Sequence, residues 1–123
     1  MRQALKFAYE SGDVRLQDVG YILTRLTPQT AIVAWQYVTD NWTKLSTTFE
    51  GTKLLYELIG LPICSMLSPD ELADAQKFVE LQKTKLANVR NSINQDIESV
   101  QKTLEWYSRD CQKVVEWAMN NKP

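Results

Sequence analysis

The chain offers few positions at which a helix must stop. Only four Gly and four Pro occur in 123 residues, whereas a β-sandwich or barrel needs turn residues every few positions. Apolar residues instead recur at spacings of three and four, as in amphipathic helices. These features predict an all-α fold. A hydrophobic content of 44% in a chain of this length suits one domain with one continuous core.

Helix boundaries in the first third follow from local signals. A first short helix carries Leu5 and ends at Gly12, because glycine readily adopts the left-handed conformation that favours helix ends. A second begins near Arg15 and carries Leu16 on its apolar face. It is expected to stop before Pro28, since the ring of proline disfavours helical geometry in the preceding residue.

A long amphipathic helix is predicted next, with Thr27 as its N-cap and Pro28 in its first turn. Its apolar face extends to Phe49, and a bend is expected near Asn41. The sequence therefore predicts that this helix forms a large part of the core.

Two further helices are predicted in the middle of the chain. A short one covers Leu54 to Ile59 and is expected to end at Gly60 and Pro62. Ser68 then starts another, with Glu71 three residues later completing a capping box.

The last third has one continuous apolar spacing from Leu86 to Ala118. Such a seam is typical of a coiled coil, but Ser108 lies within it and is a plausible helix cap. Two helices folded back on each other need the same apolar positions. We favour a break near Ser108.

The absence of histidine excludes more chemistry than any motif present. Ser-His-Asp and Cys-His nucleophilic systems and the His-Glu-x-x-His zinc site all need imidazole. No Gly-rich loop is present to hold a phosphate. A net charge of -1 gives no attraction to nucleic acid or to an anionic membrane. No catalytic residue and no metal ligand is assigned, and no membrane contact by this segment is expected.

Some carboxylates lie close together in sequence, namely Asp70, Glu71 and Asp74, and also Asp96 and Glu98. A catalytic pair among them remains an alternative. Acidic residues at a helix N-terminus are favoured by the helix dipole, however, and exposed helix faces are usually charged. We therefore interpret these residues as structural.

The two cysteines, Cys64 and Cys111, are too few for a disulfide framework or a four-ligand metal site. Buried free thiols are favoured over a mutual disulfide. Tryptophan is frequent, and three of the four residues, Trp42, Trp106 and Trp117, lie on or beside apolar faces. They are interpreted as core residues rather than as an exposed recognition surface.

Several short segments resemble the C-terminal domain of the M1 zinc aminopeptidases. They are Arg15-Leu16-Gln17-Asp18, Ala34-Trp35, Asn41-Trp42 with Phe49 downstream, and Leu72 to Phe78. The similarity covers almost the whole chain in one order. The residues that match the family pattern are Arg15, Gln17, Asp18, Ala34, Trp35, Asn41, Trp42, Phe49, Phe78, Trp106 and Trp117. The loop at Gly60 to Ser65 departs from the pattern, which leaves substrate-contacting residues unassigned.

This resemblance implies antiparallel helix pairs stacked as an armadillo/HEAT-like superhelical solenoid. Residues 1–123 would be a single helical domain, the C-terminal fragment of a larger enzyme. It would form a bowl or lid over a separate catalytic domain of the same polypeptide that holds the zinc, and would contact the distal part of peptide substrates. The resemblance further implies a membrane-anchored parent in the secretory pathway or at the outer face of the plasma membrane, where the sequon at Asn41 is a candidate for N-glycosylation.

Other functions remain open on sequence alone. A free-standing helical scaffold would bind partner proteins through an exposed groove. A coiled-coil oligomer would form through Leu86 to Ala118, and a homodimer through the whole domain is a further alternative.

Overall fold

The structure is a computed structural model that describes residues 1–122, except for the side chain of Leu16. It is all-helical over these residues, which confirms the predicted class. The helices are α1 (Arg2–Glu10), α2 (Leu16–Val19), α3 (Pro28–Asp40), α4 (Trp42–Thr48), α5 (Lys53–Cys64), α6 (Pro69–Leu81), α7 (Arg90–Trp106) and α8 (Gln112–Asn120), with a 3₁₀ segment η1 (Gly20–Arg25) and a π-helical turn η2 (Tyr107–Cys111).

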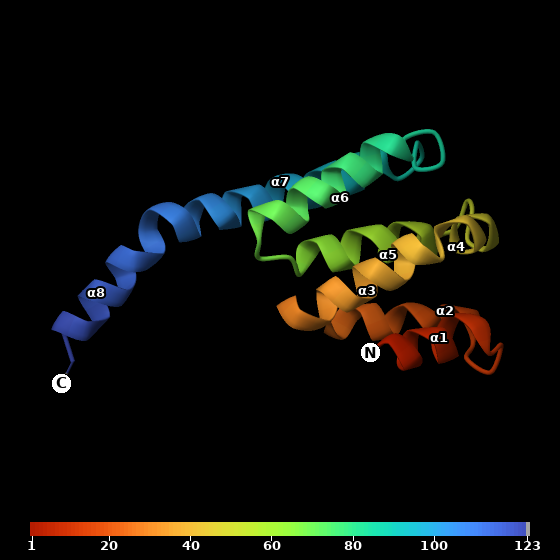
Figure 1. Ribbon diagram of the computed structural model, residues 1–123, viewed down its shortest axis with the longest axis horizontal. Helices are drawn as coiled ribbons and strands as arrows, with labels where there is room; N and C mark the ends of the chain where they lie inside the picture. The colour runs from red at the N-terminus through yellow and green to blue at the C-terminus, as the bar shows by residue number, and fades with distance from the viewer. Residues whose placement is uncertain (123) are drawn as a thin grey trace.

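Helix α5 lies at the centre of the molecule. It packs against α7 on one side and against α3 and η1 on another, while α6 packs on α7 and α1 on α3. Figure 1 shows α6 and α7 at one end of this stack and α1 and α2 at the other. The sequence of α5, KLLYELIGLPIC, is apolar on most sides, as expected for a helix surrounded by others.

The start of α3 follows the sequence prediction. Thr27 is the N-cap, and the Thr30 N–H donates to its hydroxyl at 3.3 Å. The Thr27 N–H in turn donates to the Thr30 hydroxyl at 2.8 Å, which completes a capping box that we did not predict. Gly12 has a φ of 77°, as its role after α1 requires. Asn41 separates α3 from α4 and thus confirms the predicted bend.

The predicted end of α5 is wrong. The helix continues through both Gly60 and Pro62 to Cys64. Pro62 lacks an N–H and so removes one hydrogen bond near the end of the helix. Because Gly60, Pro62 and Ile63 are all buried, packing on the neighbouring helices outweighs this local loss.

Two other local predictions also need correction. Ser68 does precede α6, but its side chain makes no capping hydrogen bond, so the predicted box with Glu71 does not form. The second predicted helix changes to 3₁₀ geometry at Gly20. Gly20 has a low helix propensity, and the Glu57 carboxylate occupies the space in which a Cβ at this position would lie. The side chain of Leu16, placed on this apolar face by the sequence, lies outside the described residues.

The C-terminal region differs most from expectation. Residues 82–89 form turns, so α7 starts at Arg90 rather than Leu86, although Leu86 is fully buried. No reversal occurs at Ser108. The chain instead passes through η2 into α8 and projects away from the stack (Figure 1). The favoured pair of folded-back helices is therefore wrong.

Because the C-terminal segment projects away from the stack, two tryptophans that were expected in the core are exposed. Trp106 is 43% exposed and Trp117 is 67% exposed, so their assignment to the core is wrong. Both cysteines are free, but Cys64 is exposed and Cys111 is only half-buried, which corrects their assignment as buried thiols. No helix in the described part of the chain has the length and apolarity to cross a membrane.

Candidate functional site

The first family-pattern residues lie at the start of α2. The Arg15 guanidinium binds the Asp18 carboxylate at 2.7 Å, and Gln17 is exposed beside them. Arg15 is the N-cap of α2 and Asp18 lies within its single turn. The pair therefore lies on the segment that joins α1 to η1.

The next residues of the pattern form an aromatic cluster between α3, α4 and α6. The Phe78 ring lies edge-on to both Trp35 (5.4 Å) and Trp42 (5.3 Å between ring centroids). Trp42 is only 6% exposed, and Ala34 is fully buried. Edge-to-face contacts of this kind add to the stabilisation from burial. These side chains thus pack together where three helices meet.

Phe49 and Asn41 hold the ends of α4. Phe49 is buried and lies edge-on to Tyr9 of α1, with 5.7 Å between the ring centroids. The Asn41 side-chain amide donates to the Tyr37 carbonyl at 2.9 Å. Asn41 is half-buried at the break between α3 and α4. Its amide nitrogen, the atom to which an N-linked glycan would attach, is thus engaged by the preceding helix.

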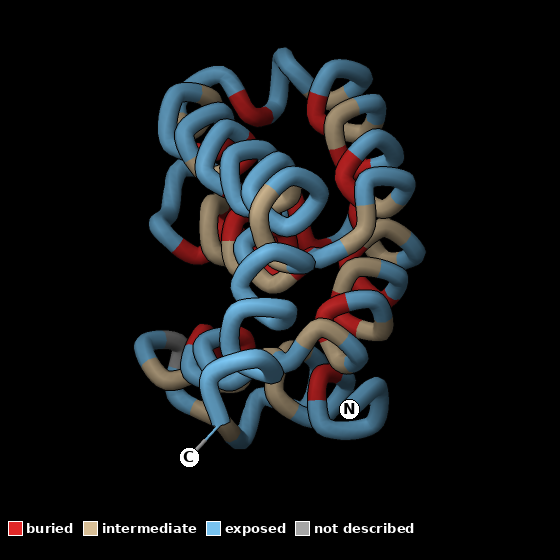
Figure 2. The backbone as a smooth tube through the Cα atoms, turned by 90° about the vertical axis from the view of Figure 1, so that its left-hand side faces the viewer, coloured by how far each residue is buried: buried red, intermediate tan, exposed pale blue. Residues whose placement is uncertain are grey.

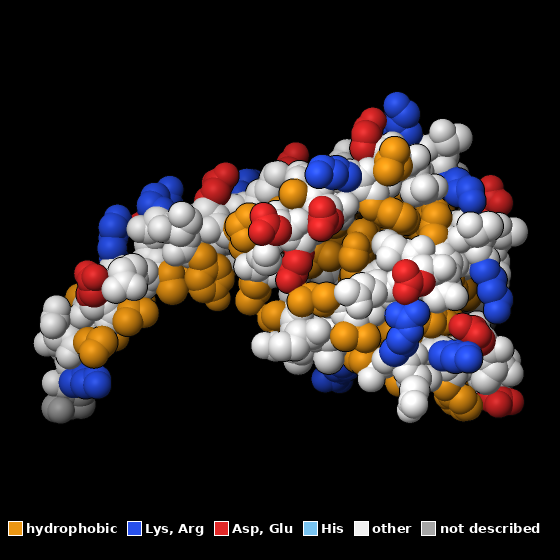
Figure 3. All heavy atoms as spheres, viewed as in Figure 1, with side chains coloured by type: hydrophobic (Ala, Val, Ile, Leu, Met, Phe, Trp, Pro, Cys, Tyr) orange, Lys and Arg blue, Asp and Glu red, His pale blue; other side chains and the backbone are white. Residues whose placement is uncertain are grey.

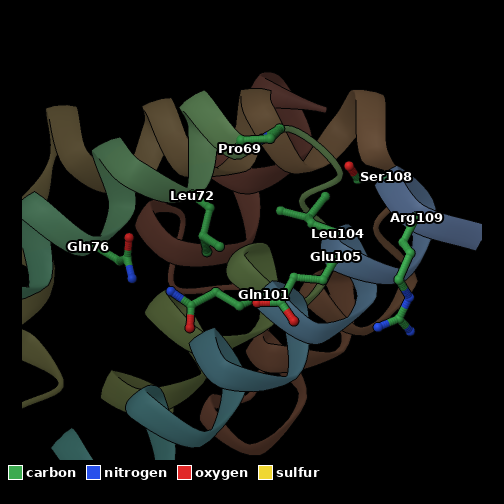
Figure 4. Close-up of a pocket in the computed structure, with 8 residues that line it drawn as sticks. All are labelled: Pro69, Leu72, Gln76, Gln101, Leu104, Glu105, Ser108 and Arg109. Atoms are coloured by element: carbon green, nitrogen blue, oxygen red, sulfur yellow. The ribbon is translucent and has the colours of Figure 1, made fainter.

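A surface depression lies where α6 meets the end of α7. It is an open groove of about 690 Å³. Figure 4 shows its lining side chains, which come from α6, α7 and η2: Pro69, Leu72, Gln76, Gln101, Leu104, Glu105, Ser108 and Arg109. We call this depression the α6–α7 groove.

The α6–α7 groove combines an apolar floor with a polar rim. Pro69, Leu72 and Leu104 supply the floor, and amides, a hydroxyl and two opposite charges supply the rim. Such a lining suits an extended peptide, whose side chains need apolar contact and whose backbone needs hydrogen bonds.

A π-helical turn forms one wall of this groove. Residues Tyr107 to Cys111 adopt the wider helix, a geometry found frequently at functional sites. Within this turn, the Arg109 guanidinium binds the Asp110 carboxylate at 2.7 Å. Lys113, at the start of α8, binds the same carboxylate at 3.3 Å. The hydrogen bond from Arg109 lowers the pKa of the Asp110 carboxyl, with a further contribution from Lys113. This turn could not be predicted, because its apolar spacing is the same as that of a regular helix.

A second polar cluster lies between α5 and α7. The Tyr56 hydroxyl donates to the Asp96 carboxylate at 2.8 Å. Desolvation, followed by this hydrogen bond, raises the pKa of Tyr56 to about 12. Cys64 lies beside the same carboxylate, and desolvation together with Asp96 raises the pKa of its thiol to about 11. A raised pKa favours the protonated thiol, which is the less nucleophilic form.

Each group of carboxylates considered for catalysis lies on a single helix. Asp70, Glu71 and Asp74 all lie on α6, with Asp70 and Glu71 in its first turn. Asp96 and Glu98 lie on α7, where Asp96 accepts a hydrogen bond from the Tyr56 hydroxyl. The described residues contain no group of three or more His, Cys, Asp or Glu side chains placed to hold a metal ion.

Comparison with known proteins assigns this architecture to a family. The family described as the ERAP1-like C-terminal domain matches residues 1–102. Aminopeptidase M1-A of Oryza sativa subsp. japonica is 34% identical over 107 residues, which is 86% of this chain and 12% of that protein. No solved structure gives a significant match.

Two animal proteins are similar over most of the chain. Endoplasmic reticulum aminopeptidase 2 of Bos taurus is 23% identical over 98% of the chain, and endoplasmic reticulum aminopeptidase 1 of Mus musculus is 23% identical over 89%. The chain spans only 12–13% of the length of these relatives. The chain therefore belongs to the ERAP1-like C-terminal domain family of the M1 aminopeptidases.

Proposed function

We propose that this chain is a non-catalytic C-terminal segment of a zinc aminopeptidase and forms part of the wall of a peptide-binding chamber. The observation that carries the proposal is the family match over residues 1–102. In this proposal residues 1–123 act as a single helical domain that covers a catalytic domain of the same polypeptide, and the enclosure opens and closes during turnover.

The helix packing supports a repeat-like architecture for this wall. Helices α6 and α7 pack as a pair, and α7 in turn packs on α5 and α5 on α3. Repeated stacking of neighbouring helices is how armadillo and HEAT arrays build a curved surface. We propose that these layers are part of such a solenoid.

The residues of this chain do not fit a catalytic zinc ion. Catalytic zinc sites in hydrolases are built mainly from histidine and carboxylate ligands, and the chain contains no histidine. We therefore place the metal in the catalytic domain elsewhere in the polypeptide. We place the parent in the secretory pathway or at the outer face of the plasma membrane, with support from the two relatives named for the endoplasmic reticulum.

The α6–α7 groove is the part of the wall best suited to contact the distal portion of a long peptide. Its apolar floor and polar rim match an extended chain. Contact there would affect long peptides alone, because a short substrate would end before it reached the groove.

A substitution that fills the α6–α7 groove tests this assignment. In the full-length aminopeptidase, Gln101→Arg projects a long charged side chain into the groove from the exposed surface of α7. We expect a several-fold lower kcat/KM for long peptides and no change for an aminoacyl chromogenic substrate. Lys102→Gln, the adjacent exposed position outside the groove lining, is the control. An equal loss on both substrates would exclude a role in distal binding.

A further inference from the structure

The two charged residues that line the α6–α7 groove differ in their partners. The Arg109 guanidinium binds the Asp110 carboxylate at 2.7 Å. Glu105 belongs to none of the ion pairs in the part of the chain that the structure describes. Gln101 and Glu105 are four residues apart on α7, so they lie on the same side of the helix. Figure 4 shows these two side chains beside each other, whereas Arg109 extends from η2 in a different direction.

The two helices that form the groove hold much of the acidic charge of the chain. Together α6 and α7 carry seven acidic and three basic side chains, a net charge of -4. The net charge of the whole chain is -1, so the residues outside these two helices carry a net charge of +3. Figure 3 shows acidic side chains gathered over the start of α6. The field of the two helices therefore attracts a cation.

The apolar floor of the groove suits the stem of a long basic side chain. Lys and Arg side chains pack their methylene groups along apolar surface while the charged end stays near water. Leu72 in the floor is buried and Leu104 is half-buried, whereas Glu105 is exposed. The Glu105 carboxylate thus lies at the border between floor and solvent. A basic side chain that rests on the floor can bring its charge to this carboxylate.

Other kinds of distal side chain use the groove less completely. An acidic side chain would meet the Glu105 carboxylate, and the one cation of the lining, Arg109, is already bound by Asp110. An apolar side chain would use the floor but would leave the Glu105 carboxylate without a partner. A charge-assisted hydrogen bond to Glu105 is available to a cationic side chain alone.

The groove is open to solvent at the end that η2 forms. No residue beyond Val100 is buried within the described residues, and Figure 2 shows this exposure along the C-terminal segment. An ion pair at such an exposed position changes affinity by roughly two- to fivefold. Dissolved salt screens it. The contact would therefore set a preference among peptides that the groove can already hold.

We propose that Glu105 is a specificity-determining residue, through which the α6–α7 groove favours a lysine or arginine in the distal part of a long peptide. This inference rests on the proposed function, because it requires the distal part of the peptide to lie in the groove. The floor holds the methylene stem and Glu105 holds the charge. Glu105 contacts no reacting atom, so it acts on which peptide is bound and not on the chemical step.

Peptides of equal length test this preference in the full-length aminopeptidase. We measure kcat/KM for sets of three long peptides that differ at one distal position, which holds Lys, norleucine or Glu, and move that position along the distal half. Where it reaches the groove, Lys should exceed norleucine by roughly two- to fivefold, and Glu should give the lowest value. The ratio of Lys to norleucine should decline as salt is raised from about 0.05 M to about 0.5 M.

Variants of Glu105 test whether this residue is responsible. Glu105→Gln keeps the size of the side chain and should equalise the Lys and norleucine peptides. Glu105→Lys should reverse the order, so that the Glu peptide is preferred over the Lys peptide. Asp13→Asn, at an exposed position after α1 and outside the groove lining, is the control for net charge and should keep the preference. Ratios of peptides within each variant cancel any difference in the amount of folded enzyme.

Two outcomes would overturn the role of Glu105. They are equal kcat/KM for the Lys and norleucine peptides at every distal position, and a preference for Lys that is unchanged in Glu105→Gln. Either outcome would leave the proposed function intact if Gln101→Arg still lowers kcat/KM for long peptides alone. Failure of the proposed function gives a different result, because Gln101→Arg would then affect long and short substrates equally or affect neither.

Discussion

The stack of helices and the C-terminal arm, which we define as η2 and α8, are built from similar side chains but differ in what surrounds them. Half of the residues from Tyr107 to Asn120 are hydrophobic, against 44% for the whole chain. In the stack these side chains meet neighbouring helices on several sides, as Leu58 and Ile59 of α5 do. In the arm they meet solvent. Apolar spacing therefore indicates that a helix has a partner, but not where that partner lies.

The largest effect should come from an aromatic residue of the stack. Trp42→Ala removes a buried ring that contacts Phe78, and we expect a loss of about 3–5 kcal/mol in the free energy of unfolding. Urea denaturation followed by circular dichroism measures it. Trp42→Phe should cost much less, because the indole N–H has no hydrogen-bond partner to lose. If Trp42→Ala lowered the free energy of unfolding only slightly, buried rings of the stack would contribute no more stability than exposed rings of the arm.

Close packing within the stack is tested at Gly60. A Cβ at this position would lie 2.7 Å from the Asp96 carboxylate and 2.7 Å from the Tyr56 ring. Gly60→Ala should therefore destabilise by about 1–3 kcal/mol from overcrowding, reduced by the better helix propensity of alanine. Gly51→Ala is a poor control because Gly51 has a φ of 73°. Ala73→Gly on the exposed side of α6 isolates the propensity effect.

The Tyr56–Asp96 hydrogen bond should make the stack sensitive to alkaline pH. Tyr56→Phe is expected to cost about 1 kcal/mol at neutral pH. The pKa of Tyr56 is raised from 10.0 to about 12 in the folded state. Its contribution is thus complete below pH 10 and is lost as the pH rises towards 12, because only the unfolded chain releases the proton in this range. Thermal melts across this range should show a shallower decline for Tyr56→Phe. Identical slopes would contradict the assignment.

The smallest effect should come from the arm. Trp117→Ala removes a ring that is 67% exposed, so the free energy of unfolding should change by less than about 0.5 kcal/mol. Urea denaturation followed by circular dichroism measures the change. A loss above about 1 kcal/mol would mean that the arm packs on its own stack, and would make the contrast with Trp42 disappear.

Several features of the fold could be predicted because their causes are local. The N-cap at Thr27 and the left-handed Gly12 depend on a few adjacent residues. The continuation of α5 through Pro62 could not be predicted, because it depends on packing against residues that are distant in sequence. The local propensity of proline indicates a helix end instead. The family pattern located Trp42 and Phe78, but only the structure shows that they meet at 5.3 Å.

The candidate site was less predictable than the fold. The α6–α7 groove combines Leu72 with Leu104 and Ser108, which are more than thirty residues away in sequence. Its polar rim consists of ordinary exposed residues of two helices. Trp106 and Trp117 were assigned to the core because an apolar helical spacing is identical for a buried and an unpartnered helix.

The π-helical turn η2 also has a consequence for the evolution of this chain. A turn closed by i→i+5 bonds holds one more residue than an α-helical turn, so η2 is equivalent to a single-residue insertion in an otherwise continuous helix. Deletion of one residue there would restore regular geometry and leave the residues beyond it on nearly the same side of the helix, because the wider turn contains the extra residue. A relative that lacks this residue would therefore present Val115 and Trp117 in nearly the same direction, so that a single codon can be gained or lost at η2 without turning the side chains of α8.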